Sequence, residues 1–486
     1  MALILTSILS LLLTLIEGAR IGAIKMQGEL AAETSMESAL SEFHRELLKQ
    51  YDLLFIDVSY GTGNYSEEAL TEHLTACAEK NLSRGGLSFP EKKTFTGTGE
   101  AEVSVTGTRY AADNGAQALL EQVYAYMSAD PAEEIAGEAL GIIEGWKGSE
   151  INVDEWKRKK QEIGRDADEA LDLSHKRFED LRSRFIQNNS SGNSANVPDK
   201  EGEANSDKRT GFVRSLRNIM NDASLSWIYG ESGSLSDAAV SRSDYISMRD
   251  FHTGSSLAVQ NTHHYREADQ IGFDEYILEK CGTLLTGNGG SALKYETEYI
   301  LFGGETDKDN LTGMMTSLLL VREAANAAYI FRDGAKCAEA ESLAAGVCTL
   351  LLIPECTEAV KSLILAAWAC AESESDVKTL MKGGRVPLMK TSSDWKTKMW
   401  DILLRPAAYK GGEGLSYQDY LRIFLFLENQ EQAAFRLMDV MEMNIRATDG
   451  NSGFRMDWCL DSFSADFTVE SSSGHRFRFS KEISYN

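Results

Sequence analysis

The chain has 486 residues, which is long enough for two or three domains and a substantial core. It contains 74 Asp and Glu against 49 Lys and Arg, so its formal net charge is −25 at pH 7. This excess argues against sequence-independent binding to nucleic acid, because such binding needs a basic surface that displaces counterions. The chain has only six prolines and many Ala, Leu and Glu residues, and this composition favours helix over sheet.

The first predicted element is a long apolar helix. Residues 2–16 are apolar except for four Ser and Thr, and no proline occurs before Tyr60, so we expect the helix to continue past Glu17. Residues 2–16 alone would span roughly 22 Å, short of a hydrocarbon core of about 30 Å. Extension to Ile24 supplies the missing length if Glu17 and Arg20, three apart on one helical face, pair with each other.

We predict that this stem is a single-pass anchor in the cell membrane and that the large domain is extracytoplasmic. The alternatives are a cleaved signal peptide and a buried helix of a cytosolic protein. The run has no basic residues before it, so we expect either that the true N-terminus lies upstream or that the stem inserts without a positive flank. Arg20 and Lys25 on its C-terminal side would favour a cytoplasmic domain by the positive-inside rule, but Glu17 and Glu29 flank them and leave orientation open. Glu17 is the candidate polar contact within the stem, because an ionisable group in lipid seeks a partner.

Four apolar residues extend the helical pattern beyond the stem. Met36, Leu40, Phe43 and Leu47 are spaced by 4, 3 and 4 residues, which places them on one side of a helix. They predict an amphipathic stalk that packs through this side. Stem and stalk together form the region 1–50.

The predicted fold class is α+β and predominantly helical. After the stem and stalk come four further regions: a small α/β region at 51–150, a charged helical arm at 151–187, a flexible linker at 188–210 and a mostly helical C-terminal domain at 211–486. Within the α/β region the expected elements are strands at 52–60 and 101–110, and helices at 66–82, 115–128 and 131–146, the last opened by Asp130 and Pro131.

Three patterns define the later regions. Residues 188–210 hold almost no large apolar side chain, so they cannot bury enough surface to offset chain ordering, which predicts a linker. The apolar runs 343–353 and 359–371 are too short to cross a bilayer and predict a buried helical hairpin. Phenylalanines alternate with polar residues in 462–469 and 475–483, which predicts a β-hairpin that closes the C-terminal domain.

Six segments spread over nearly the whole chain resemble an uncharacterised family of Gram-positive bacterial proteins. They are EGAR at 17–20, HRELL at 44–48 followed by YDLLFID at 51–57, KYETEYILFG at 294–303, VREAAN at 321–326, GGRVPL at 383–388 and LSYQDYL at 415–421. Members of that family carry a pilin-like N-terminal helix and accompany tight-adherence (Tad) pilus genes. The resemblance implies an extracytoplasmic protein with a layout similar to TadE/TadG-type minor components. It also implies two kinds of partner, the membrane and other pilin-like or Tad assembly proteins. The chain departs from a pilin pattern in its missing basic leader and its large C-terminal half.

Signatures of catalysis are missing from the sequence, which has no GxSxG, HExxH, P-loop or CxxC motif. The glycine-rich loop 287–290 lacks the following Lys-Ser/Thr of a phosphate site, and the adjacent His263 and His264 would point to opposite sides of a strand. Asp307 and Asp309 suggest a calcium loop, but Asp309 is better explained as the cap of a helix that begins near residue 311. We therefore expect no cofactor and no metal.

Other polar and aromatic groups predict packing rather than chemistry. Arg322 and Glu323 in an apolar helix suggest a buried pair that holds residues 294–298 in register. The aromatic cluster of Tyr417, Tyr420, Phe424 and Phe426 predicts helix packing. Seven cysteines, an odd number without metal-ligand spacing, predict free thiols rather than a disulfide scaffold.

The sequence thus favours a structural role over an enzymatic one. The first hypothesis is a membrane-anchored, minor pseudopilin-like component that works at the cell surface in a Tad-type pilus or secretion apparatus. A surface-displayed adhesin or binding module is the alternative, and a membrane-tethered hydrolase of unknown type is a further one.

Overall fold

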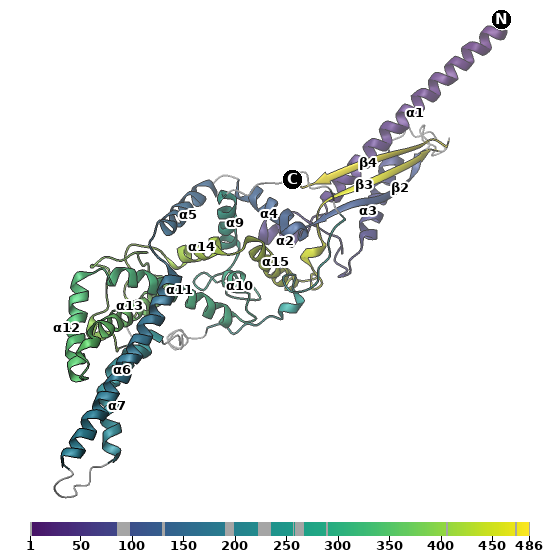
Figure 1. Ribbon diagram of the computed structural model, residues 1–486. Coiled ribbons are helices and arrows are strands. Elements are labelled where there is room, and N and C mark those ends of the chain that lie inside the picture. The colour runs from purple at the N-terminus through teal and green to yellow at the C-terminus, as the bar shows by residue number, and fades with distance from the viewer. Residues whose placement is uncertain are drawn as a thin grey trace.

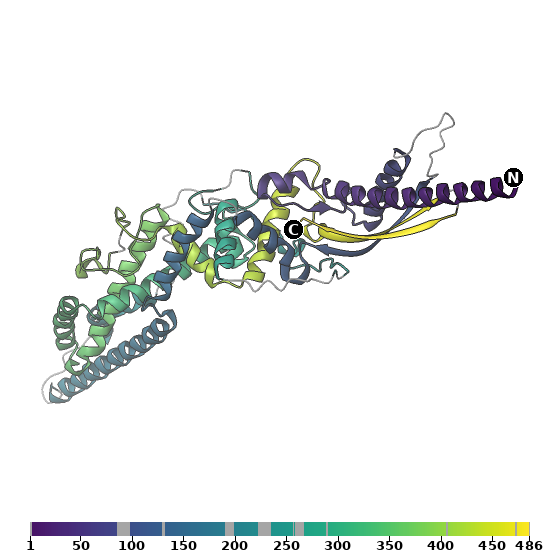
Figure 2. The ribbon, with the colours of Figure 1, turned by 90° about the horizontal axis from the view of Figure 1, so that it is seen from above.

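The computed structural model describes residues 2–84, 98–128, 132–189, 199–221, 235–255, 257, 267–287, 290–404, 407–471 and 474–485. The molecule is elongated, with the N-terminal helix at one end and a group of long helices at the other (Figures 1 and 2). Helices predominate and a small sheet accompanies them, so the predicted α+β class is confirmed.

The N-terminal helix α1 (Ala2–Leu40) continues past Glu17 without a break, as expected. It ends at Leu40, however, and a second helix, α2 (Arg45–Tyr51), follows after a turn. His44 starts this second helix, because its Nδ1 accepts a hydrogen bond from the Leu47 amide at 3.2 Å. The prediction of one continuous helix through residue 50 is therefore wrong.

A four-stranded antiparallel sheet packs beside α1 (Figure 1). Its strands are β1 (Ile56–Asp57), β2 (Thr98–Tyr110), β3 (Cys459–Ser471) and β4 (Arg476–Ser484). β3 is central, since β2 pairs along one edge while β1 and β4 pair along the other. The expected strands at 101–110, 462–469 and 475–483 are confirmed, whereas only two residues of 52–60 form a strand.

The C-terminal hairpin completes the sheet that begins in the first 110 residues, rather than closing the C-terminal domain. Phe463, Phe467 and Val469 on β3 are buried together with Val103 of β2 and Met36 of α1. These phenylalanines need an apolar partner surface, and α1 with helix α3 (Glu67–Arg84) provides it. The predicted regions 51–150 and 211–486 therefore share one sheet.

A central helical core lies next to the sheet (Figure 1). It contains α2 and six further helices: α4 (Asp113–Met127), α5 (Ala132–Lys147), α9 (Glu267–Lys280), α10 (Glu296–Phe302), α14 (Tyr417–Leu427) and α15 (Gln430–Arg446). Tyr417 and Tyr420 are buried here, and Phe424 packs against them, which confirms the predicted packing role of these aromatic residues. The expected start of α5 at Asp130 and Pro131 lies outside the described residues.

Within the described residues, the distal end opposite the stem contains five long helices. They are α6 (Val153–Asn189), α7 (Asp199–Asn221), α11 (Asp307–Ile330), α12 (Gly334–Leu350) and α13 (Thr357–Met381). α11 contributes Leu311 and Leu318 to the central core and Ala327 and Ile330 to the distal core, so it connects the two. The short 3₁₀ helices are η1 (Arg242–Asp244), η2 (Pro354–Cys356), η3 (Met399–Asp401) and η4 (Met456–Trp458).

The predicted linker at 188–210 is wrong for residues 188–189, which belong to α6, and for residues 199–210, which belong to α7. Residues 190–198 lie outside the described residues. Val213, Leu216 and Met220, further along α7, are buried in the distal core with residues of α6 and α13. Packing at these positions stabilises the C-terminal part of α7. The polar first turns of α7 are then also helical, because extending a helix from a formed nucleus is favourable. α6 and α7 thus form a helical hairpin.

The apolar runs 343–353 and 359–371 form a helical hairpin, as expected, but its two helices are buried to different extents. α13 is buried almost throughout, whereas α12 buries only Ala340, Ala344 and Cys348. All seven cysteines are free, in agreement with the sequence.

Candidate membrane-proximal site

The first turns of α1 expose apolar side chains that none of the described elements covers. Leu3 is 84% exposed, Leu9 58% and Ile16 51%. Such a contiguous apolar surface is unusual for a helix in water. α1 is long and apolar enough to cross a membrane.

The second half of α1 packs against the sheet and α3. Gly28 lies under the ring of Phe479, and a Cβ at this position would approach the ring to 2.7 Å. Gln27 donates a hydrogen bond to the Leu82 carbonyl of α3 at 2.7 Å. Lys481 of β4 forms an ion pair with Glu29 at 3.6 Å. The helix is thus bare in its first half and held by two elements in its second.

Glu17 marks the boundary between the bare and the packed parts. Its carboxylate lies 3.8 Å from Arg20 and 3.2 Å from Nε2 of His475. His475 directly precedes β4, so the turn between β3 and β4 reaches the helix at this level. The structure therefore provides Glu17 with partners from its own chain at the end of the apolar segment.

The four predicted stalk residues are not brought together. Met36 is buried and Leu40 partly buried against the sheet, while Phe43 is half-buried beyond the end of α1. Leu47 lies in α2 and packs with Tyr51 in the central core. The prediction that they form one packing stripe is wrong, because the turn after Leu40 redirects the chain.

Sequence reasoning missed His475 and Lys481, which contact α1 from about the opposite end of the chain. No local periodicity could relate them to α1. The available signal was the apolar face of the predicted hairpin, since Phe477 and Phe479 require a surface to cover them.

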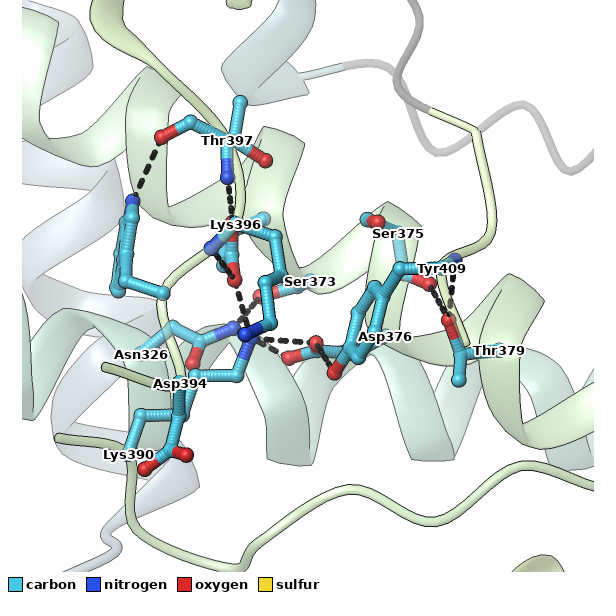
Figure 3. Close-up of polar contacts among 12 residues, drawn as sticks. Asn326, Ser373, Ser375, Asp376, Thr379, Lys390, Asp394, Lys396, Thr397 and Tyr409 are labelled. Carbon is cyan, nitrogen blue, oxygen red and sulfur yellow. Dashed lines mark hydrogen bonds and ion pairs between the residues drawn. The ribbon is translucent and has the colours of Figure 1, made fainter. Parts of the chain in front are cut away.

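A second polar site lies in the distal part, and its charged side chains are buried. Asp376 of α13 accepts hydrogen bonds from Lys390 at 2.6 Å and from Tyr409 at 2.9 Å (Figure 3). Arg322 also donates to this carboxylate, at 2.9 Å. Lys390 also pairs with Glu372. Burial favours the neutral acid, but Arg322 and Lys390 hold the pKa of Asp376 below its usual range.

This cluster, which we name the buried ionic cluster (Arg322, Glu372, Asp376, Lys390 and Tyr409), ties the segment after α13 to the helix. Arg322 donates to the carbonyls of Pro387 and Leu388, both at 2.9 Å. Two cations balance two anions, and the four charged side chains have no exposed surface. Each of these buried charges therefore has an opposite charge beside it, which offsets the cost of removing it from water.

Arg322 and Glu323 occupy different sites, contrary to the sequence-based hypothesis. Glu323 accepts from Lys160 at 2.8 Å and from the Trp156 indole at 3.0 Å, which joins α6 to α11. Neither residue pairs with the segment 294–298. Side chains on consecutive helical positions point about 100° apart, so a shared partner was geometrically unfavourable.

The acidic residues of the KYETEY segment instead hold a neighbouring loop. Glu296 accepts from the Gly282 amide at 2.6 Å and Glu298 from the Leu284 amide at 2.9 Å. Asp307 accepts from the Lys294 amide at 3.1 Å. These carboxylates replace the missing backbone partners of an irregular segment.

The suggested calcium loop is a helix cap. α11 begins at Asp307, and its cap is Thr306, whose side chain accepts from the Asp309 amide at 3.0 Å. Asp309 reciprocates by accepting from the Thr306 hydroxyl at 2.8 Å. The expectation that Asp309 is itself the cap is wrong by three positions. Among the residues that the structure describes, no cluster suited to a metal ion occurs, and His263 and His264 lie outside them.

Glu298 should make stability depend on pH. Burial raises the pKa of Glu298 to about 7 from 4.5, although hydrogen bonds from Tyr417 and the Leu284 amide oppose the rise. The fold therefore favours the protonated acid, so the free energy of unfolding should fall as pH rises through this interval. We expect Glu298→Gln to remove up to about 3 kcal/mol of this fall.

The measurement is denaturant unfolding of the detergent-solubilised chain at pH 5 and pH 8. Glu102→Gln on the exposed face of β2 is the control and should keep the wild-type difference between the two pH values. An equal difference in Glu298→Gln and in wild type would contradict the assignment.

Comparison with known proteins gives one match. The model of a family of unknown function (DUF5702) matches residues 202–471, from α7 to the end of β3. No curated protein and no solved structure matches the chain.

Proposed function

The chain belongs to the family of unknown function DUF5702, and we propose that it is a membrane-anchored extracytoplasmic assembly component. In this proposal it acts as a minor pseudopilin-like subunit of a Tad-type pilus or secretion apparatus. Its role is structural and not enzymatic. Its partners are the membrane and the stems of other pilin-like or Tad assembly proteins.

The observation that carries the proposal is the contrast between the two halves of α1. The first half exposes Leu3, Leu9 and Ile16 to the surroundings, and the second half is held by the sheet and α3. A helix built in this way can embed its free half in lipid while the sheet supports it from outside. Packing of such stems against each other would then build an assembly. The apparatus itself is suggested by the resemblance of the six sequence segments to proteins that accompany Tad genes.

Glu17 provides a test of stem-mediated assembly. We expect Glu17→Leu to lower the recovery of pilus components with the tagged, detergent-solubilised protein, because an acidic group at the lipid boundary favours a polar partner. Quantitative mass spectrometry of the co-purified proteins measures this recovery. Unchanged recovery would count against the proposed assembly role.

His475→Ala is the matched control, because it removes one of the two partners of Glu17 within the chain and leaves the carboxylate in place. If Glu17 acts through other stems, His475→Ala should retain the co-purifying proteins. Equal losses in both variants would indicate that Glu17 only supports the contact between α1 and the hairpin. Protease treatment of intact cells tests the sidedness: an extracytoplasmic domain should be cleaved without lysis.

One feature of the distal end favours the alternative of a surface-displayed binding module. Leu350 of α12 is 77% exposed and Trp400 of η3 71%, and both line one groove far from the stem. A chain lacking residues 2–16 would test this function by its binding to cells or glycans. A fragment of residues 211–486 would be unsuitable, since it lacks β1, β2 and α1, against which β3 and β4 pack.

A further inference from the structure

A second cavity lies in the central helical core, between the η1 segment and the N-terminus of α15. Its volume is about 270 Å³. Its lining residues are Arg242, Ser247, Met248, Asn429, Glu431, Gln432, Phe435 and Arg436. Two arginines therefore face one small space in a chain whose net charge is −25.

Arg436 is 8% exposed and only partly satisfied. Its Nη1 donates to the carbonyls of Ile300 at 2.8 Å and Leu301 at 2.7 Å, and lies 3.5 Å from Glu428. Its Nε and Nη2 have no hydrogen-bond acceptor among the residues that the structure places. Gly303 leaves room for the guanidinium, since a Cβ there would lie 2.8 Å from Nε.

Arg242 has no carboxylate partner within the described part of the chain. Its Nη2 donates only to the sulfur of Met248 at 3.2 Å, and its Nε is buried without an acceptor. Two other arginines with little or no exposed side chain differ in this respect: Arg322 pairs with Asp376, and Arg422 pairs with Glu275. A buried cationic donor without an acceptor costs free energy, which a bound anion would recover.

Of the acidic groups near the cavity, Glu428 pairs with Arg436 at 3.5 Å, whereas no described carboxylate pairs with Arg242. The carboxylate of Glu431 lies against Gly115, and that of Asp439 takes its hydrogen bonds from Ser247 and Tyr299. Burial and, to a lesser extent, the charge of Arg242 lower the pKa of Arg436, although Glu428 opposes this shift. Arg242 is therefore the arginine of this cavity that has no paired carboxylate within the described residues.

We propose that this cavity binds a small molecule through an oxyanion group, a carboxylate or a phosphate. Arg242 and Arg436 would donate to the oxyanion, as guanidinium groups commonly do. The N-terminus of the 17-residue helix α15 adds a favourable partial positive charge. The side chains of Phe435 and Met248 form an apolar wall that would contact the part of the ligand beyond its oxyanion group. The inference concerns a site remote from the stem and does not depend on the proposed assembly role.

The test measures thermal unfolding and calorimetric binding of the full chain in detergent. The probes are inorganic phosphate and succinate, each compared with chloride at equal ionic strength. At least one probe should raise the unfolding midpoint of the wild-type protein, because a ligand that binds only the native state stabilises it. Stabilisation by one probe alone would identify the preferred oxyanion, and stabilisation by both would support the shared chemistry.

Arg242→Gln should weaken binding of the effective probe by about tenfold to a hundredfold, the usual worth of a charged hydrogen bond. Gln432→Glu is a second variant, which adds a negative charge at the cavity. Position 432 is the third residue of α15, where glutamate is favourable, so the substitution should preserve the helix. It should also weaken binding. Arg385→Gln, at an exposed arginine that contacts only the Gly414 carbonyl, is the control and should bind normally.

Two results would overturn the proposal. One is the absence of stabilisation by phosphate and succinate beyond that of chloride. The other is equal binding by wild type, Arg242→Gln and Gln432→Glu, which would place the anions elsewhere.

Discussion

Replacing Leu9 and Leu12 together by arginine should move the protein from the membrane pellet to the soluble fraction. Both leucines lie in the bare half of α1 and are 58% and 50% exposed. An arginine near the middle of a membrane helix costs about 2.5–3.5 kcal/mol on insertion scales, and a leucine contributes about −0.3 to −0.6 kcal/mol. The double substitution should therefore oppose insertion by roughly 6–8 kcal/mol. Fractionation after an alkaline carbonate wash measures the outcome.

Leu181→Arg with Phe185→Arg is the matched control. These residues lie on α6 in the distal arm and are 48% and 67% exposed, so they present a similar apolar surface far from the stem. The control should remain in the pellet. Recovery of wild-type protein in the soluble fraction without detergent would contradict the anchor, as would retention of the stem variant in the washed pellet.

Lys390→Ala should lower the free energy of unfolding by about 3–5 kcal/mol, since it leaves Glu372 buried without its cation. Lys390 and Glu372 have no exposed side-chain surface, so water cannot replace the lost partner. Removal of the lysine also weakens the contact between Asp376 and the segment after α13. Denaturant unfolding followed by tryptophan fluorescence is a suitable measurement, because Trp368 and Trp395 lie in the same core.

Two further variants test whether the unpaired buried charge causes this loss of stability. Arg332→Ala breaks an ion pair with Glu150 whose side chains are 69% and 64% exposed, and it should cost no more than about 1 kcal/mol. Lys390→Met with Glu372→Gln removes both charges and should recover part of the stability, because no uncompensated ion remains buried at this position. A loss for Lys390→Ala that is as small as that for Arg332→Ala would contradict a stabilising role for the buried ionic cluster.

The elements predicted best depend on residues close in sequence. The passage of α1 through Glu17, the helix after Ser66 and the alternation in β3 and β4 all follow from patterns within about a dozen residues. The prediction failed at Leu40, where the heptad-like spacing of apolar residues continued but the chain turned. The cap formed by His44 decides that turn, and its backbone amide is held by the Phe55 carbonyl at 2.8 Å.

Contacts between distant residues account for the remaining errors. Polar composition at 188–210 predicted a linker, but burial of Val213 and Leu216 draws α7 into the distal core and extends the helix back to Asp199. Similarly, the two arginines of the central cavity are 194 positions apart in the sequence (436 − 242 = 194), and neither has a local motif. Their proximity could not be inferred from spacing.

The sequence by itself determined the apolar stem, the helical character of most of the chain, the free thiols and the hairpin, because each follows from local periodicity or composition. Only the tertiary structure decided that the C-terminal hairpin supports the N-terminal helix, that Glu17 meets His475, and that Arg322 and Glu323 serve different sites. The physical reason is that an apolar face or a buried charge requires a partner, but the local sequence does not identify that partner. That choice is made by the packing of segments that lie from 54 to 458 positions apart in the sequence.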